Sequence, residues 1–250
     1  VSYQWYKDGN PLSGGDSRSV FIEAMDSEHE GSYSVEVANA NGSILVGSTR
    51  VRMIREALIN ISTRGFVGVD ADVMIAGFII TGTQSRRVLI RGLGESMAAR
   101  DPNIEGVLAD PKLTLHNWKG EMILSQDNWS EELNSETIDS VGLSVGAATP
   151  ADPDEAVILT TLEPGLYTVV LSGVDRGTGL GLIEVFDASS ESIETRLANI
   201  STRLRASTGQ EVAIAGFVIT GQDPKRVLIR ALGPELLKRK VSGVLSDPQM

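Results

Sequence analysis

The acidic side chains of one long polar stretch are the residues of this sequence best suited to hold a metal ion. Calcium takes about six to eight oxygen ligands at relaxed geometry, and carboxylate and amide side chains supply them. If the two ends of the stretch 127–156 meet, five oxygen-bearing side chains could converge on one calcium ion: Asp127, Asn128, Asp152, Asp154 and Glu155. The stretch lacks the D-x-D-x-D-G spacing, and its second end serves equally well as a turn and a strand start.

Two tryptophans are the candidates for binding a sugar. Trp118 stands in the predicted hairpin turn N-W-K-G, and Trp129 opens the polar stretch. An exposed aromatic ring beside Asn and Asp can stack on a sugar ring, which makes a carbohydrate the predicted ligand. The alternative is that each indole covers an open end of the core, since tryptophan combines a large apolar body with one polar group. Both interpretations stay open for both residues.

Catalytic patterns are weak in this chain. The two histidines, His29 and His116, lie in parts of the sequence that we expect to fold separately, so neither a Ser-His-Asp triad nor a histidine metal site is indicated. The stretch 177–181, GTGLG, superficially matches a phosphate-binding loop. Such loops open a helix, whereas the next residues, LIEVFD, have the pattern of a strand. We therefore expect a hairpin turn there and a protein that is not an enzyme.

Composition excludes several classes of partner. The 250 residues carry a net charge of −11, and no basic patch is visible that would bind nucleic acid. No apolar run approaches the ~20 residues of a membrane span. Cysteine is absent, so neither disulfides nor cysteine zinc sites are expected. The chain begins in mid-pattern at a residue other than Met, so we expect a fragment.

A long internal repeat organises most of the sequence. Residues 58–94 align without gaps with 197–233, and NISTR, IAGF and RVLIR recur 139 residues later. The match continues at 106–108 and 243–245, where the offset falls to 137. A period of this length is the size of a whole domain rather than of a solenoid repeat. The sequence thus predicts three domains: 1–54, 57–190 and, as a truncated second copy, 196–250.

Short apolar segments separated by turn residues predict strands throughout the first copy. We expect hairpins at Lys119-Gly120 and at Glu163-Pro164-Gly165, a helical turn at 96–100 and a short helix near 135–141. The strand arginines, Arg64 and Arg91 with their repeats Arg203 and Arg230, are expected to be paired or bonded to backbone at strand ends. The expected strands cover 58–63, 73–80, 86–93, 112–118, 121–126, 157–162, 166–174 and 179–188.

The first fifty residues resemble an immunoglobulin-like domain. Trp5 fits the core tryptophan of that fold, and Asp26, Gly31 and Tyr33 fit its D-x-G-x-Y corner. Val35 stands where many members of the family have cysteine, so packing alone must close this core. The strands expected before Trp5 are missing from the sequence. The resemblance implies an incomplete immunoglobulin-like sandwich over 1–54.

The repeated unit resembles a module of large secreted bacterial proteins. The resemblance rests on NISTRGFVG, IAGFIITG, RVLIRGLG and GVLADPKLTLHN, and on EAVILTTLEPGLYTVVLSGV, whose E-P-G-x-Y-T-V also resembles pre-peptidase C-terminal-type sandwich domains. It implies an extracellular, non-catalytic β-sandwich and brings no catalytic residues with it. The expected fold is all-β: the immunoglobulin-like sandwich, then a jelly-roll-like β-sandwich and a partial second copy.

These features predict a structural and adhesive segment of a secreted or cell-surface bacterial protein. Its tandem β-domains would act as spacer and display modules, with recognition on their rim loops. The expected partners are surface polysaccharide or protein, with neither nucleic acid nor membrane insertion, and no cofactor is required apart from the candidate calcium. The alternative is an accessory carbohydrate-binding module attached to an extracellular hydrolase outside this segment.

Overall fold

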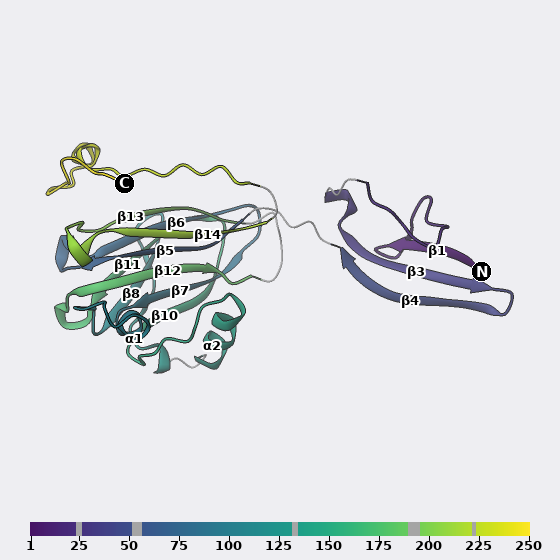
Figure 1. Cartoon of the computed structure of the whole chain (residues 1–250), viewed down its shortest axis with the longest axis horizontal. Coiled ribbons are helices and arrows are strands. Elements are labelled where there is room, and N and C mark those ends of the chain that lie inside the picture. Colours follow the sequence, from purple (N-terminus) through teal and green to yellow (C-terminus); the bar gives the residue numbers. More distant parts are fainter. Residues whose placement is uncertain (24–26, 52–56, 132–134, 190–195, 222–223) are drawn as a thin grey trace. The chain divides into compact units, whose positions relative to one another are not determined.

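A computed structural model places most of the chain in two compact units, Val1–Arg55 and Glu56–Met250. Each unit is described by itself (Figure 1). The units are built almost wholly from antiparallel sheets, so the predicted all-β class is confirmed. The structure describes residues 1–23, 27–51, 57–131, 135–189, 196–221 and 224–250.

The first unit is one antiparallel sheet of four strands in the order β2-β1-β3-β4. Turn residues separate the paired strands: Asp8 and Gly9 take left-handed φ values of 51° and 79° between β1 and β2, and Gly42 begins β4. The strands are β1 (Ser2–Lys7), β2 (Asn10–Pro11), β3 (Gly31–Asn39) and β4 (Gly42–Val51), with a short 3-10 helix at Ser27–His29 before β3.

Tyr33 makes the backbone hydrogen bond expected of a corner tyrosine. This side chain is buried, and its hydroxyl donates a hydrogen bond of 2.9 Å to the carbonyl oxygen of His29. Trp5 lies opposite Val35 in the β1–β3 pair and donates from Nε1 to the carbonyl oxygen of Ser17. The indole is therefore held in place by the sheet and a loop. Asp26, predicted to share the corner, lies outside the described residues.

The described residues of the second unit form ten strands in one antiparallel sheet that folds over on itself. The strand order is β10-β7-β12-β5-β13-β6-β11-β8-β9, and β14 also pairs with β5. The strands are β5 (Ala57–Val67), β6 (Met74–Thr81), β7 (Arg86–Leu93), β8 (Pro111–Asn117), β9 (Met122–Gln126), β10 (Ala156–Leu162), β11 (Gly165–Gly173), β12 (Gly179–Asp187), β13 (Arg196–Arg203) and β14 (Ile214–Thr220).

The larger apolar core of the unit lies between the two halves of the folded sheet, which makes the unit a β-sandwich. Alternate residues of nearly every strand point into this core, as the period-two pattern of the sequence predicts. Its large, fully buried members include Ile61, Met74, Phe78, Ile80, Ile90, Leu113, Leu115, Leu171 and Ile183. At about 25 cal/mol per Å² of buried apolar surface, this core dominates the stability of the unit.

The described connections of the second unit contain two α-helices. The predicted helical turn is α1 (Glu95–Arg100), and the predicted short helix is α2 (Ser135–Ser144), somewhat longer than expected. Ile138 and Gly142 of α2 are buried four residues apart on the face that meets the sheet. Further 3-10 turns cover Asp70–Asp72, Trp129–Glu131, Val174–Arg176, Gly209–Glu211 and Pro234–Arg239.

Two of the predicted hairpins are wrong. The hairpin at Lys119-Gly120 is confirmed by the β8–β9 pair, but β10 pairs with β7 while β11 pairs with β6 and β8. The connection Glu163-Pro164-Gly165 therefore carries the chain from one half of the sandwich to the other. A connection of this length can join two paired strands of a hairpin or two strands in opposite halves of a sandwich. Which of the two forms depends on the distant strands that pair with β10 and β11.

The glycine-rich stretch 177–181 is likewise a crossing rather than a hairpin turn. It leads into β12, which pairs with β5 and β7 and not with the preceding strand β11. Gly179 is required by close backbone approach, since a Cβ atom there would lie 2.6 Å from the carbonyl oxygen of Val107. The amide of Leu108 bonds the carbonyl oxygen of Leu180 at 2.8 Å beside this contact. The glycines thus serve packing.

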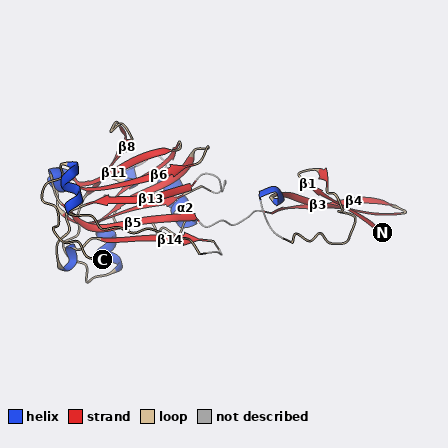
Figure 2. Ribbon diagram, turned by 90° about the horizontal axis from the view of Figure 1, so that it is seen from above, coloured by secondary structure: helices blue, strands red, loops and turns tan. Residues whose placement is uncertain are grey.

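The two sequence copies exchange their first two strands with each other. β5 pairs with β14 of the second copy, and β6 pairs with β13 of the second copy. Six of the seven residue pairs correspond, and the registers differ only at the bulge: Arg64 lies opposite Ile214, and Arg203, the repeat of Arg64, lies opposite Ile75, the repeat partner of Ile214. Figures 1 and 2 show these segments, far apart in sequence, side by side. A sheet edge of each copy is therefore completed by the other.

Side-chain contacts follow the same exchanged symmetry. A Cβ atom at Gly77 would lie 2.7 Å from Ser201 Oγ, and one at Gly216 would lie 2.8 Å from Ser62 Oγ. The two pairs are related by the 139-residue repeat. Glycine therefore admits the serine of the opposite copy at both positions. The prediction that 196–250 is a separate domain stays a prediction, because its first two strands belong to the compact unit of the first copy.

The rest of the second copy keeps one local contact of the first copy but not its strands. A Cβ atom at Gly94 would lie 1.8 Å from the carbonyl oxygen of Leu108, and one at Gly233 would lie 1.9 Å from that of Leu245. By contrast, residues 226–230 form no strand, whereas their repeat partners lie in the buried strand β7. The repeated sequence RVLIR is thus a strand in the first copy and not in the second.

Candidate functional site

Glu155, the innermost of the predicted calcium ligands, is fully buried and engaged by the protein itself. Its Oε1 accepts hydrogen bonds of 2.8 Å from the backbone amides of Gly94 and Ser96. Its Oε2 accepts a bond from the Ser96 hydroxyl, and Ser96 Oγ in turn accepts the amide of Ala151 at 2.7 Å. Burial raises the pKa of the Glu155 carboxyl, with the hydrogen bonds acting in the opposite direction. The carboxyl anchors the end of the 127–156 stretch to the start of α1.

The other predicted calcium ligands make separate local contacts. Asp152 Oδ1 accepts the amide of Asp154 at 2.9 Å, a turn interaction. Asp127 lies 3.6 Å from the ammonium of Lys112, and Asn128 accepts the amide of Glu131 through its backbone carbonyl. Over the described part of the chain, no group of three or more acidic or histidine side chains is arranged to hold a metal ion. The calcium hypothesis gains no geometric support from these residues.

Asp110 is an acidic residue near this region that sequence reasoning missed. Burial raises the pKa of its carboxyl, and the negative charges of Asp154 and Asp127 raise it further. Its Oδ1 is buried without a hydrogen-bond partner among the described residues. The pattern Asp-Pro at 110–111 predicts a strand start and gives no sign of this electrostatic neighbourhood.

The 127–156 stretch covers the outer face of the sandwich rather than forming an open rim. Ile138 of α2 packs with Leu89, Val157 and Phe186 in a second apolar cluster on that face. Trp129 is half-buried against the cluster and donates from Nε1 to the carbonyl oxygen of Asp152 at 2.9 Å. This geometry corresponds to the covering role that was one of the two interpretations of Trp129.

A shallow groove of about 440 Å³ lies beside the other tryptophan, on the outer face of β8 and β11. Trp118 is 71% exposed at the tip of the β8–β9 hairpin, and the Lys119 ammonium lies 5.5 Å from the centre of its ring. Leu166, which is 59% exposed, forms part of the apolar floor. The groove is lined by His116, Asn117, Trp118, Gly120, Leu166, Thr168 and Val170.

Polar groups of the groove are positioned by the hairpin that carries them. His116 Nε2 lies 3.0 Å from Thr114 Oγ1, so the ring is held against its own strand. Asn117 Oδ1 accepts the amides of Lys119 and Glu121 at 2.9 and 3.1 Å. The groove therefore combines a rigid turn, an exposed indole and an apolar floor. The alternating pattern of β11 in the sequence predicts that Leu166, Thr168 and Val170 share one face of the strand. It does not predict that this face lies beside Trp118.

Buried arginines stabilise the central strands. Arg91 is 3% exposed; its guanidinium donates to Glu184 Oε2 and to the carbonyl oxygen of Ala148, and lies 5.3 Å from the centre of the Phe186 ring. The prediction of a paired strand arginine is confirmed at Arg91. It is not confirmed at Arg64, whose Nε is buried without a partner among the described residues. In the second copy, the repeats of these two residues, Arg203 and Arg230, are exposed.

Comparison with known proteins does not identify the family of this chain. No family model, no curated protein and no solved structure matches the chain. Among the described helices, none is long and apolar enough to cross a membrane. Function must therefore be argued from the sandwich, the exchanged strands and the groove beside Trp118.

Proposed function

We propose that this chain is a non-catalytic structural segment in which successive β-modules are joined by exchanging strands. It would serve as a spacer and display arm of a secreted or cell-surface protein. The observation that carries the proposal is the matching register of the β5–β14 and β6–β13 pairs, in which six of the seven residue pairs correspond. A flexible linker leaves neighbouring domains free to move, whereas this junction is part of the sheet itself.

The centre of the exchange is well packed. Thr63 Oγ1 and Thr202 Oγ1, which are repeat partners, lie 2.8 Å apart. Leu197 of β13 is 2% exposed and packs into the core of the first copy. Separating the copies would expose this side chain and break both strand pairs together. A junction of this kind favours a stiff arm over an adaptable one.

The resemblances of the sequence support the same role. The tyrosine corner at Tyr33 fits an immunoglobulin-like unit, and the repeated module fits the tandem β-domains of large secreted bacterial proteins. Such chains present binding modules at a distance from a surface. The expected partners are neighbouring modules of the same protein and a polysaccharide or protein of the surface.

Hydrogen exchange on variants of the second copy tests the proposal. Leu197→Ala removes a buried side chain and should cost about 2–5 kcal/mol. Because Leu197 belongs to the core of the first copy, faster exchange should appear in β6 and β11 as well as in β13. Leu228→Ala, at a position that is 84% exposed, is the matched control and should leave exchange unchanged. Faster exchange confined to β13 would show that the copies are independent and would contradict the proposal.

A second candidate function, carbohydrate binding, is favoured by the groove beside Trp118. The open indole and the apolar floor offer the stacking surface that a sugar ring requires, and the neighbouring Lys119 favours an acidic saccharide. Titration of the chain with soluble neutral and acidic polysaccharides should show binding that Trp118→Ala abolishes. Lys119→Ala should weaken binding to the acidic polysaccharide more than to the neutral one. Binding that survives Trp118→Ala would contradict a site in this groove.

A further inference from the structure

We propose that the edges of β5 and β6 recognise one further copy of the same module across a two-fold axis, whether that copy belongs to the same chain or to another. The inference rests on the proposed joining of modules by exchanged strands, and it adds the identity and the number of the partners. In a two-fold interface both partners use the same patch, so the interface is closed and accepts no third copy.

Equivalent positions of the two copies touch each other along the interface. Thr63 Oγ1 lies 2.8 Å from Thr202 Oγ1. The guanidinium of Arg205 lies 6.0 Å from the centre of the Phe66 ring. A position meets its own equivalent only close to a two-fold axis, so these contacts mark an axis between β5 and β13. The pairs, each separated by the 139-residue offset of the repeat, are Leu58–Leu197, Thr63–Thr202 and Phe66–Arg205.

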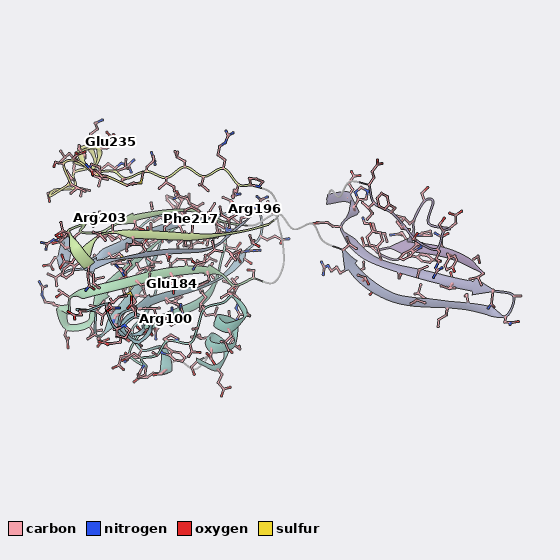
Figure 3. The ribbon with its side chains drawn as sticks, viewed as in Figure 1. Arg100, Glu184, Arg196, Arg203, Phe217 and Glu235 are labelled. Carbon is pink, nitrogen blue, oxygen red and sulfur yellow. The ribbon has the colours of Figure 1, made fainter. Side chains whose placement is uncertain are left out.

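The strand pairs beside this axis are reciprocal. Thr63 lies opposite Ala215 in the β5–β14 pair. Their equivalents, Thr202 and Ala76, lie opposite each other in the β13–β6 pair. Figure 3 labels Phe217 on β14 and Arg203 on β13, the two strands that the second copy contributes. Each copy thus gives and receives the same contacts, which is the property of a self-complementary interface.

The exchanged strands fill edges that the described strands of the first copy do not occupy. β5 pairs with β12 as well as with β14, and β6 pairs with β11 as well as with β13. The segments NISTR and IAGF, which lie in these strands, are identical in the two copies. A module therefore presents to its partner the same residues that it receives. The same module of a second chain offers the same backbone hydrogen bonds and the same alternating side chains.

Blocking exchange within one chain tests whether the edges accept the module of another chain. Thr202→Pro and Ala215→Pro together place proline inside β13 and β14, where it is incompatible with strand pairing. The edges of β5 and β6 are then free. We expect sedimentation velocity to show a dimer of this proline-blocked chain, with β5 of each chain paired with β6 of the other. Leu228→Pro, at a position that is 84% exposed and outside the strands, is the control and should stay monomeric like the natural chain.

Cysteines at Ser62 and Gly77 report the register of this dimer. Ser62 lies opposite Gly216, the equivalent of Gly77, so two-fold pairing places Ser62 of each chain opposite Gly77 of the other. Mild oxidation of the proline-blocked chain should then give a dimer linked by two disulfides. Cysteines at Ser62 and Ile79, two residues out of register, are the control and should stay free. A monomer at every concentration, whether folded or unfolded, an intramolecular disulfide, or a dimer without the expected crosslink would overturn the proposal.

The glycine–serine contacts separate this proposal from strand exchange itself. In the natural chain, Gly77→Ala should lower the urea midpoint, and Ser201→Ala should restore most of the loss, whereas Ser62→Ala should not. Gly216→Ala should be rescued by Ser62→Ala and not by Ser201→Ala. Both rescues together with a monomeric proline-blocked chain would leave the exchanged junction standing and refute recognition of a second chain. Rescue in only one of the two pairs would overturn the two-fold relation, and rescue in neither would contradict the exchange as well.

Discussion

Replacing Glu155 tests whether this carboxyl is an internal anchor or a metal ligand. Its Oε1 accepts the amides of Gly94 and Ser96, and its Oε2 accepts the Ser96 hydroxyl. Glu155→Ala leaves two buried amides without an acceptor. Each costs about 1–3 kcal/mol when stranded, and relief of the buried charge offsets part of the loss. We expect a fall of about 3 kcal/mol in the free energy of unfolding at pH 7.

Glu155→Gln should behave in the opposite way. The glutamine oxygen can accept both amides, and its NH2 can donate to Ser96 Oγ, as a protonated carboxyl would. Because burial raises the pKa of Glu155 above 4.5, the folded chain holds this proton more tightly than the unfolded chain does. The stabilisation that comes from binding this proton is fully present below about pH 4.5 and is lost as the pH rises through the folded-state pKa. The glutamine variant should therefore match the natural chain near pH 4 and be at least as stable at pH 7.

Urea unfolding followed by circular dichroism between pH 4 and 8 measures this difference. Glu131→Gln, at an exposed position, is the control and should shift stability by less than about 0.5 kcal/mol. If Glu155→Gln lost as much stability as Glu155→Ala, or if its deficit grew with rising pH, the anchor reasoning would be refuted. Repeating the titration with calcium and with EDTA tests the metal-ligand role, under which calcium would stabilise only the natural chain.

Three further substitutions probe other contacts, each measured by urea unfolding. Arg91→Met leaves Glu184 as an unpaired, largely buried charge and should cost about 3–5 kcal/mol, and adding Glu184→Gln should recover part of that loss; no recovery would contradict the pairing. Gly94→Ala places a Cβ atom against the carbonyl oxygen of Leu108 and should cost about 3 kcal/mol, whereas a neutral result would mean that the backbones are farther apart. Tyr33→Phe removes the corner hydrogen bond and should cost the first unit about 1 kcal/mol, with an unchanged midpoint counting against the corner.

Local sequence signals predicted the strands well because each depends on its own residues. Alternating apolar positions placed β8 and β11, and Lys119-Gly120 marked a true hairpin. The same signals failed at 163–165 and 177–181, where a short connection crosses between halves of the sandwich. Such a crossing depends on which distant strands fill the neighbouring edges, and no local pattern contains that information.

The candidate site shows the same division. The exposed setting of Trp118 agrees with its position in a hairpin turn, which local sequence indicates. The burial of Glu155 and Trp129 depends on α1 and on the covering of the outer face, neither of which the acidic pattern of 127–156 reveals. The sequence also does not reveal that the copies exchange strands. Because the copies are alike, each strand could pair with its neighbour in the same copy or with the equivalent strand of the other copy.

Engineered cysteine pairs test the central claim of strand exchange most directly, because the natural chain has no cysteine. Cysteines at Ser62 and Gly216, or at Ser201 and Gly77, lie opposite each other in the exchanged sheet. Cysteines at Ser62 and Gly77 would be opposite only if each copy paired its own strands. After mild oxidation, intact mass and non-reducing electrophoresis should show an intramolecular disulfide in the first two variants and free thiols in the third. A disulfide in the third variant, with free thiols in the other two, would contradict the exchange.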